Sequence, residues 1–182
     1  MTKISILLPY KENFSPEYAG AVSLFVKDTT SISLFKKQIT VYGNTNFKKK
    51  YKINYRNILI KRKFLNSTSK RYIEEFLNNE KKDPSDLIEV HNRPSYIKPI
   101  YEKLKKDVIL YYHNDPLSMG GSQSISERLY LLNNCESIIV ISEWIKKRLL
   151  KDLSVSDDLR RKIHVIPHST NKINNLDLIK RK

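Results

Sequence analysis

Two short polar turns, each beginning with a histidine, follow two hydrophobic runs of the sequence. They read His91-Asn92-Arg93-Pro94 and His113-Asn114-Asp115-Pro116. Histidine has an ordinary pKa near neutral pH, so it suits proton transfer and hydrogen bonding to a reacting group. A single histidine at such a place is more often a hydrogen-bonded structural residue. Two at matching positions favour one shared polar cleft.

The same residues could be considered as metal ligands. The candidates are His91, His113 and Asp115, but the sequence lacks short ligand spacings such as H-x-H or H-E-x-x-H. We therefore expect no metal and no bound cofactor. The single cysteine, Cys135, has no motif around it and is interpreted as a buried small apolar residue.

A third feature is the small-residue turn Ala19-Gly20-Ala21, which opens a predicted helix after the first hydrophobic run. Backbone N–H groups at such a helix start can approach an anion. The alternative is a plain helix start in which Gly20 serves tight packing. The patterns G-x-G-x-x-G, G-x-x-x-x-G-K-[ST] and G-x-S-x-G are absent. NAD enzymes, P-loop ATPases and α/β-hydrolases are therefore disfavoured.

Short apolar runs alternate with helical periodicity along the chain. The pattern predicts strands at 4–9, 38–43, 57–60, 86–91, 108–113, 137–141 and 163–166. It predicts helices at 20–35, 67–79, 96–106, 122–134 and 142–153. This alternation predicts an α/β fold: a doubly wound, mostly parallel sheet of about seven strands with helices on both faces. Ligands of such sheets bind beyond the carboxyl ends of the strands, where both histidine turns fall.

Length and composition limit the class of protein. The 182 residues suffice for one domain with a hydrophobic core. One cysteine excludes a disulfide framework and a four-cysteine zinc site, and it fits a reducing compartment. The apolar runs are too short to span a membrane, and the N-terminus lacks a cleavage pattern. We therefore expect a cytoplasmic protein.

The chain is strongly basic, with 34 Lys and Arg against 19 Asp and Glu and a net charge of +15. A solvated lysine-rich surface is one interpretation, and attraction to an anionic membrane leaflet is another. The segment 142–153, with Trp144 and several lysines, could lie at such an interface, although packing on the sheet is favoured. Nucleic acid is a disfavoured partner, because no helix-turn-helix, RRM, KH or zinc-finger pattern is present.

Four segments together resemble the N-terminal domain of GT-B glycosyltransferases of the family 4 type. They are the first strand with its loop and Ala19-Gly20-Ala21, DLIEVHNRP, VILYYHNDP, and ESIIVISEWIKKRLL followed by KIHVIPHSTN. The last pair is the most specific. The resemblance covers about residues 3–171, nearly the whole chain.

This resemblance implies a Rossmann-like half that holds the acceptor and closes on a nucleotide-sugar donor. Gly20 matches a loop that approaches the donor diphosphate, and His113 matches a histidine at the sugar-transfer cleft. Ser142 and Glu143 match a helix start that faces this cleft. We therefore expect His113 to be catalytic and a further set of residues to bind substrate: Gly20, His91, Asn92, Arg93, Asn114, Ser142 and Glu143.

The sequence also departs from the family pattern. Ala19-Gly20-Ala21 replaces a double glycine, and His168-Ser169-Thr170-Asn171 replaces an Asn-Gly-Val-Asp type turn, which alters the hinge. We expect a domain at 1–171 and a basic tail or the start of an interdomain linker at 172–182. The second domain, with its Glu-x7-Glu donor motif, is expected to be absent.

The leading hypothesis is therefore a glycosyltransferase half that transfers a sugar to a glycan or lipid-linked acceptor in cell-surface polysaccharide synthesis. A separate donor-binding domain or subunit would be its partner, with peripheral contact to the inner face of the membrane. One alternative is a non-catalytic module that binds the acceptor, either truncated or part of a split enzyme. Another is a basic nucleic-acid-binding protein.

Overall fold

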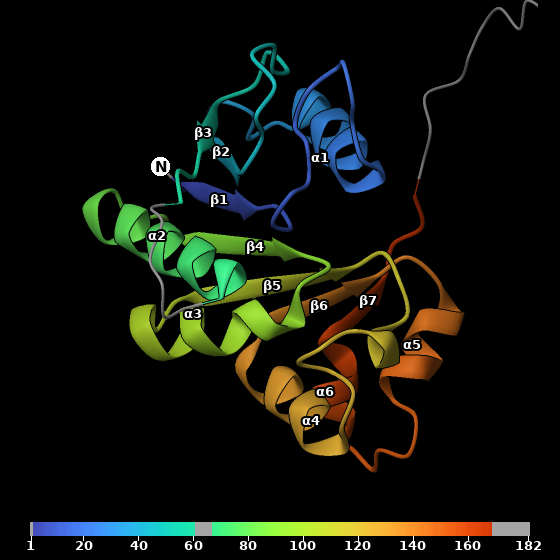
Figure 1. The fold of residues 1–182 in the computed structure, drawn as a ribbon. Helices are drawn as coiled ribbons and strands as arrows, with labels where there is room; N and C mark the ends of the chain where they lie inside the picture. Colours follow the sequence, from blue (N-terminus) through green and yellow to red (C-terminus); the bar gives the residue numbers. More distant parts are fainter. Residues whose placement is uncertain (1, 61–66, 169–182) are drawn as a thin grey trace, which may run out of the picture.

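A computed structural model describes residues 2–60 and 67–168 of the chain. Its centre is a seven-stranded sheet in the order β3-β2-β1-β4-β5-β6-β7, with every neighbouring pair parallel (Figure 1). The strands are β1 Ile4–Leu7, β2 Ile39–Gly43, β3 Tyr55–Asn57, β4 Leu87–His91, β5 Asp107–Tyr112, β6 Ser137–Val140 and β7 Ile163–Val165. The strand order changes direction between β1 and β4. The predicted doubly wound, Rossmann-like fold is thus confirmed.

Helices connect most of the strands. They are α1 Ala21–Ile32, α2 Thr68–Lys82, α3 Ile97–Leu104, α4 Ile125–Asn134, α5 Glu143–Leu149 and α6 Asp157–Arg161, with 3₁₀ turns η1 Pro94–Tyr96 and η2 Pro116–Ser118. Several element bounds differ from the sequence-based expectation, and β3, α5 and α6 are examples. β3 begins two residues earlier than predicted, α5 ends four residues earlier, and α6 was not predicted. α6 contains no buried residue, so it leaves no apolar periodicity in the sequence.

The two faces of the sheet are covered differently. Alternate residues of a strand point to opposite faces. Ile6 and Leu8 pack with Val22 and Val26 of α1, whereas Leu7 belongs to a larger core cluster. That larger cluster contains buried side chains of α2, α3, α4 and α5. Among the described helices, α1 therefore packs alone on its face, and Figure 1 shows it across the sheet from α2 and α3.

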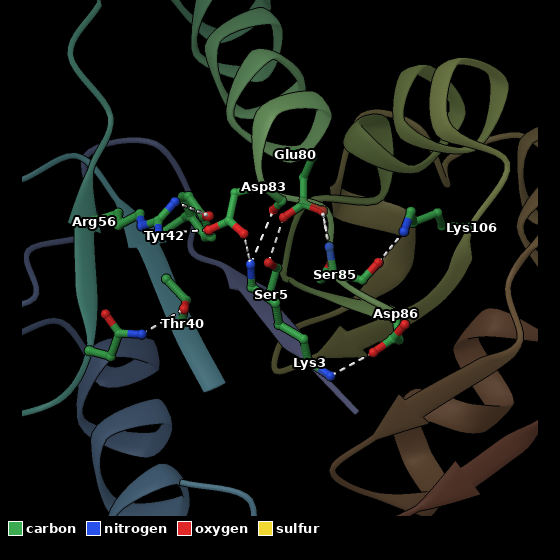
Figure 2. A network of polar contacts seen from close by, with 11 residues as sticks. Lys3, Ser5, Thr40, Tyr42, Arg56, Glu80, Asp83, Ser85, Asp86 and Lys106 are labelled. Carbon is green, nitrogen blue, oxygen red and sulfur yellow. Dashed lines mark hydrogen bonds and ion pairs between the residues drawn. The ribbon is translucent and has the colours of Figure 1, made fainter. Parts of the chain in front are cut away.

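A polar network closes the amino edge of the sheet (Figure 2). Glu80, near the end of α2, is 1% exposed. Its carboxylate accepts hydrogen bonds from the Ser5 hydroxyl (2.5 Å), the Ser85 hydroxyl (2.8 Å) and the Ser85 backbone N–H (3.1 Å). Asp83, which follows α2, is paired with Lys3 and Arg56. The network joins α2 to β1, to β3 and to the segment that enters β4.

Candidate functional site

Three histidines at the carboxyl edge of the sheet form a hydrogen-bonded row that ends on a carboxylate. Glu89 Oε1 lies 2.5 Å from His91 Nε2. His91 Nδ1 lies 2.9 Å from His113 Nε2. His113 Nδ1 lies 2.8 Å from His168 Nε2. We call Glu89, His91, His113 and His168 the histidine row.

The sheet brings the row together. β4 and β5 are neighbours, with His91 opposite Tyr111 in the register. Glu89, His91, Tyr111 and His113 alternate with the core residues of their strands, so they share the face on which α1 packs. His168 returns to them just after β7. The predicted meeting of His91 and His113 at one edge is thus what the structure shows.

Aromatic rings hold the histidines in place. Tyr111 is stacked against His91 at 5.2 Å and against His113 at 4.8 Å between ring centroids. Phe25 of α1 stacks on His168 at 4.5 Å and meets His113 edge-on at 5.1 Å. These contacts restrict the rotation of the imidazole rings, which keeps the hydrogen-bonded order of the row.

The environment keeps the central histidine neutral. Burial, followed by the neighbouring His91 and His168, lowers the pKa of His113 to about 3. Burial and His91 also lower the pKa of His168. Burial, with a smaller contribution from Glu89, raises the pKa of Tyr111 to about 12. At neutral pH, His113 therefore acts as a neutral hydrogen-bonding group rather than as a cation.

Two asparagines connect the turns that carry the histidines. Asn92 Nδ2 donates to Asn114 Oδ1 at 2.8 Å, and Asn92 Oδ1 accepts the His113 backbone N–H at 3.0 Å. Asn92 adopts a left-handed conformation with φ of 53°, which asparagine tolerates better than most residues. Arg93 donates from Nη1 to the Asn92 carbonyl at 2.8 Å. Asn92 and Asn114 thus position the backbone of His113, and their contact with substrate stays a prediction.

The start of α1 already holds an anionic side chain. Gly20 is the N-cap of α1, with no side-chain cap of its own. Glu12 Oε1 accepts the backbone N–H of Ser23, in the first turn of the helix, at 3.0 Å. A Cβ at Gly20 would lie 2.0 Å from Glu12 Oε1, so glycine permits this approach. A donor diphosphate at this helix start would have to displace the Glu12 side chain.

The remaining predicted residues lie apart from the row. Ser142 caps α5 by accepting the Ile145 backbone N–H at 3.3 Å, and Glu143 is exposed. Within residues 2–60 and 67–168, no hydrogen bond joins either of them to a histidine of the row. Asp115 accepts two hydrogen bonds from Arg148 Nε, both at 3.1 Å, and one from Arg148 Nη2 at 2.8 Å, which anchors α5 to the turn after β5.

An open groove of about 290 Å³ runs beside the row on the α1 face. Its lining includes Phe25, Leu87, Glu89, Tyr111 and Ile166. One end of the row, Glu89, reaches this groove with 22% of its side chain exposed. The other end, His168, is exposed at the carboxyl edge. The buried middle of the row therefore connects two accessible ends.

Sequence reasoning did not identify Glu89, His168, Phe25 or Glu12 as site residues. One signal was available: Glu89 is a charged residue inside a hydrophobic strand, two positions before His91 and hence on the same face. Cys135 is buried as predicted, at 1% exposure, and burial raises its pKa to about 12. In the described part of the chain, no group of three or more His, Cys, Asp or Glu side chains is arranged to hold a metal ion.

The fold is shared with solved enzymes that are distant in sequence. A sucrose-phosphate synthase from Thermosynechococcus elongatus has a TM-score of 0.61 and 12% identity, covering 92% of this chain and 90% of that one. Anabaena Alr3699/HepE in complex with UDP-glucose has a TM-score of 0.62 and 11% identity, and the match covers 92% of this chain and 44% of that one. The lipopolysaccharide outer core galactosyltransferase WaaB has a TM-score of 0.63 and 14% identity, and the match covers 93% of this chain and 46% of that one. The chain thus spans less than half of the latter two proteins.

These structures are GT-B glycosyltransferases, and the chain has the fold of one of their Rossmann-like halves. A UDP-GlcNAc 2-epimerase from Methanocaldococcus jannaschii shares the fold as well, with a TM-score of 0.56 and 16% identity. No family model and no curated protein sequence matches the chain. None of the helices in residues 2–60 and 67–168 has both the length and the apolar character needed to cross a membrane.

Proposed function

We propose that this chain is the acceptor-side half of a glycosyltransferase. Its reaction is the transfer of a sugar from a nucleotide-sugar, most simply a UDP-sugar, to a glycan or lipid-linked acceptor of cell-surface polysaccharide synthesis. The observation that carries the proposal is the histidine row at the carboxyl edge of a GT-B type sheet, close to the point where the strand order changes direction. Ligands of this fold bind at that place.

The geometry suits the acceptor side of such a reaction. The attacking hydroxyl must lose a proton, and a neutral imidazole can accept it. His113 stays neutral because its pKa is lowered to about 3, and the asparagine pair fixes its backbone. The helix start at Gly20 supplies backbone N–H groups for a phosphate only when Glu12 moves away. Arg93 is the cation within the first histidine turn.

The chain needs a second half for donor binding in this proposal. Residues 1–171 form the acceptor-side domain, with 172–182 as a basic tail or the start of a linker, and a donor-binding domain or subunit completes the cleft. Catalysis requires donor and acceptor in near-attack geometry, with the charge of the leaving diphosphate stabilised. The proposed setting is cytoplasmic, at the inner face of the membrane.

The test compares the chain alone with the chain joined to the donor-binding half of a GT-B glycosyltransferase. Calorimetry with UDP-glucose, UDP-GlcNAc and GDP-mannose measures donor binding, and a transfer assay measures product. We expect weak, salt-sensitive nucleotide binding and little transfer by the chain alone, and transfer by the joined protein. Acceptor binding without transfer in either form would instead support the non-catalytic module. Conversion of UDP-GlcNAc to its C2 epimer would support an epimerase half.

A membrane contact has separate support at the amino edge. Nine large hydrophobic side chains are exposed in the described residues, and three of them lie at the last residue of α1 and directly after it: Ile32 (77%), Leu34 (95%) and Phe35 (50%). Exposed Lys36 and Lys37 follow directly. Apolar side chains beside lysines suit an anionic bilayer, where each base contributes about 1 kcal/mol. We assign the membrane contact to this segment, which we call the 32–37 loop.

The predicted interfacial helix fits less well. Ile145 and Leu149 of α5 are buried against the sheet, as favoured from the sequence, and only Trp144 of its large apolar side chains is mainly exposed. The 32–37 loop lies at the edge opposite the histidine row, because α1 runs from one edge of the sheet to the other. If this loop contacts the bilayer, the cleft beside the histidine row faces away from the membrane. That orientation suits an acceptor whose glycan end extends away from the lipid.

Vesicle flotation tests this assignment. Wild-type protein should float with phosphatidylcholine–phosphatidylglycerol vesicles and much less with phosphatidylcholine alone. The double variant Leu34→Ser/Phe35→Ser should lose most of the binding, while Leu59→Ser, at an equally exposed leucine elsewhere (72%), should keep it. Equal vesicle binding by both variants would reject the 32–37 loop as the membrane contact. Tight, salt-sensitive RNA binding without vesicle binding would support a nucleic-acid partner instead.

A further inference from the structure

We propose that the histidine row is a proton relay, which takes up a proton at His168 and stores it on His91 as an ion pair with Glu89. This inference rests on the proposed function for its use in catalysis, because the proton would come from the acceptor hydroxyl. His113 acts on the reacting groups through His168, because both of its ring nitrogens are hydrogen-bonded within the row. Glu89 and His91 are positioning and proton-holding residues, not catalytic ones.

The order of donors and acceptors follows from the carboxylate. An ionised carboxylate only accepts hydrogen bonds, so His91 Nε2 must carry the hydrogen in the 2.5 Å contact with Glu89. In neutral His91, Nδ1 is then an acceptor, and His113 Nε2–H donates to it. By the same reasoning His113 Nδ1 accepts from His168 Nε2–H. Among the described residues, nothing is hydrogen-bonded to His168 Nδ1, so its lone pair is the open position at the exposed end of the row.

Addition of one proton at that end reverses both hydrogen bonds between the histidines. His168 gains hydrogen at Nδ1 and passes its Nε2 hydrogen to His113 Nδ1. His113 passes its Nε2 hydrogen to His91 Nδ1. His91 then carries hydrogen on both nitrogens and is an imidazolium beside the Glu89 carboxylate. Atoms and charge balance: one proton enters, the two hydrogen bonds between histidines reverse, the His91–Glu89 bond keeps its direction, and one positive charge arrives at His91.

The surroundings explain why the charge rests at His91. His91 is the row's histidine in contact with a carboxylate, and its side chain is fully buried. Burial and the two flanking histidines disfavour charge on His113, whose pKa is lowered to about 3. The pKa of His168 is lowered as well. Glu89 lines the groove on the α1 face, which gives the stored proton a route to solvent.

Other titratable groups near the row are few. From β5, Tyr111 stacks on His91 and His113, and its pKa is raised to about 12, so it stays protonated. From α1, the row meets the ring of Phe25, which does not titrate. On β4, Glu89 is itself the end of the row. The pH response of the row should therefore be set by its own four members.

Nitrogen NMR of the histidine-labelled chain tests the relay without any transfer assay. The chain has four histidines, and exposed His164 on β7 is an internal reference outside the row. At high pH, His91, His113 and His168 should all be Nε2–H tautomers. As one proton is taken up, His113 and His168 should change to the Nδ1–H tautomer in step while His91 becomes doubly protonated. Independent titrations without tautomer exchange would overturn the relay.

Variants then separate the carboxylate from the rest of the row. Glu89→Gln replaces a group that only accepts by one that can also donate, so the Nε2–H tautomers should no longer be the single arrangement of the row, whereas Glu136→Gln, at an exposed glutamate, should leave them unchanged. His168→Ala changes an exposed side chain, so folding should be kept. In that variant His91 and His113 should remain Nε2–H tautomers, because Glu89 sets their order. Loss of this order would reject Glu89 as the anchor.

The role in catalysis is measured separately in the joined two-domain enzyme. Glu89→Gln should lower kcat about tenfold and move the acidic limb of the pH–rate profile to lower pH, with KM for the donor unchanged. An unchanged profile with the NMR signature intact would show that a relay exists but does not serve transfer. Absence of transfer in the wild type would count against the proposed function and leave the NMR result as it stands.

Discussion

Each of the two polar networks of the sheet contains a carboxylate, buried in one and partly exposed in the other, with opposite consequences. At the amino edge, the Glu80 carboxylate accepts three hydrogen bonds from two serines and is enclosed (Figure 2). At the carboxyl edge, Glu89 contacts one imidazole and begins a row that ends at an exposed histidine. A network in which every donor has its acceptor supports folding. A row with an unused lone pair at its end is available for chemistry.

The partners explain this contrast. Hydroxyl and backbone N–H donors near Glu80 hold fixed hydrogens that do not leave at neutral pH. A neutral imidazole near Glu89 carries one hydrogen, which can sit on either of its two ring nitrogens. The same geometry of the row therefore allows two arrangements of the hydrogens. The following predictions separate a stability role at the amino edge from a functional role at the carboxyl edge.

The largest expected effect is that of His113→Ala on transfer by the joined two-domain enzyme. Loss of a positioned acid, base or hydrogen-bonding group lowers kcat by about 10² to 10⁴-fold. The unfolding midpoint in urea should change much less than the rate. His164→Ala, at the exposed histidine of β7, is the matched control. Near-normal turnover with intact folding would show that His113 is structural.

The next effect is on stability, at the other edge. Glu80→Ala leaves the hydroxyls of Ser5 and Ser85 and the Ser85 N–H buried without their acceptor. The free energy of unfolding should fall by about 2–4 kcal/mol, because buried unpaired donors cost about 1–3 kcal/mol each and relaxation recovers part. Glu80→Gln keeps an acceptor oxygen and should lose less. Urea unfolding measures both, and Glu74→Ala on the same helix should have a small effect.

The pH dependence of stability should single out His113. Its pKa is about 3 in the folded chain against an ordinary value of 6.5. Between these values the unfolded state binds more protons, so the contribution of His113 is fully present above pH 6.5 and is lost as the pH falls toward 3. Urea unfolding over this range should show a steeper loss for the wild type than for His113→Phe. Parallel curves would mean that His113 is not desolvated.

The smallest expected effects concern the start of α1. Glu12→Gln keeps an acceptor for the Ser23 N–H but removes the negative charge, so stability should fall by about 0.3–1 kcal/mol. The same change should increase affinity for UDP several-fold, because the diphosphate no longer competes with a carboxylate. Calorimetry with UDP measures this, and Glu17→Gln at an exposed position is the control. Weaker UDP binding by Glu12→Gln would contradict the proposal that the start of α1 binds the diphosphate in place of the Glu12 carboxylate.

Gly20→Ala provides an independent check of the same arrangement. The new Cβ would collide with the Glu12 carboxylate, which is the flexible end of a side chain and can move. Displacement breaks the bond to the Ser23 N–H, so we expect a loss of about 1 kcal/mol in unfolding free energy. The loss should largely vanish when Glu12→Ala is already present, because alanine leaves no side chain for the new Cβ to displace. Additive losses would contradict a direct contact.

Much of the architecture could be predicted from the sequence because it depends on local patterns. Apolar runs and helical periodicity located all seven strands, and the parallel order followed from their alternation with helices. The histidines at the ends of two strands were placed at one edge by the same rule. α6 was not found because it buries no residue, and β3 was displaced because its side chains are only partly buried.

Within the site, the sequence by itself determined that His91 and His113 end neighbouring strands, since strand order and length are local consequences of pattern. Only the tertiary structure decided what completes them. His168 joins across 55 residues of chain, Phe25 comes from the helix on the same face, and Glu12 reaches the start of α1. Such contacts depend on side-chain directions and loop paths that no periodicity records. The hydrogen-bonded order from Glu89 to His168 therefore became visible only when the sheet was assembled.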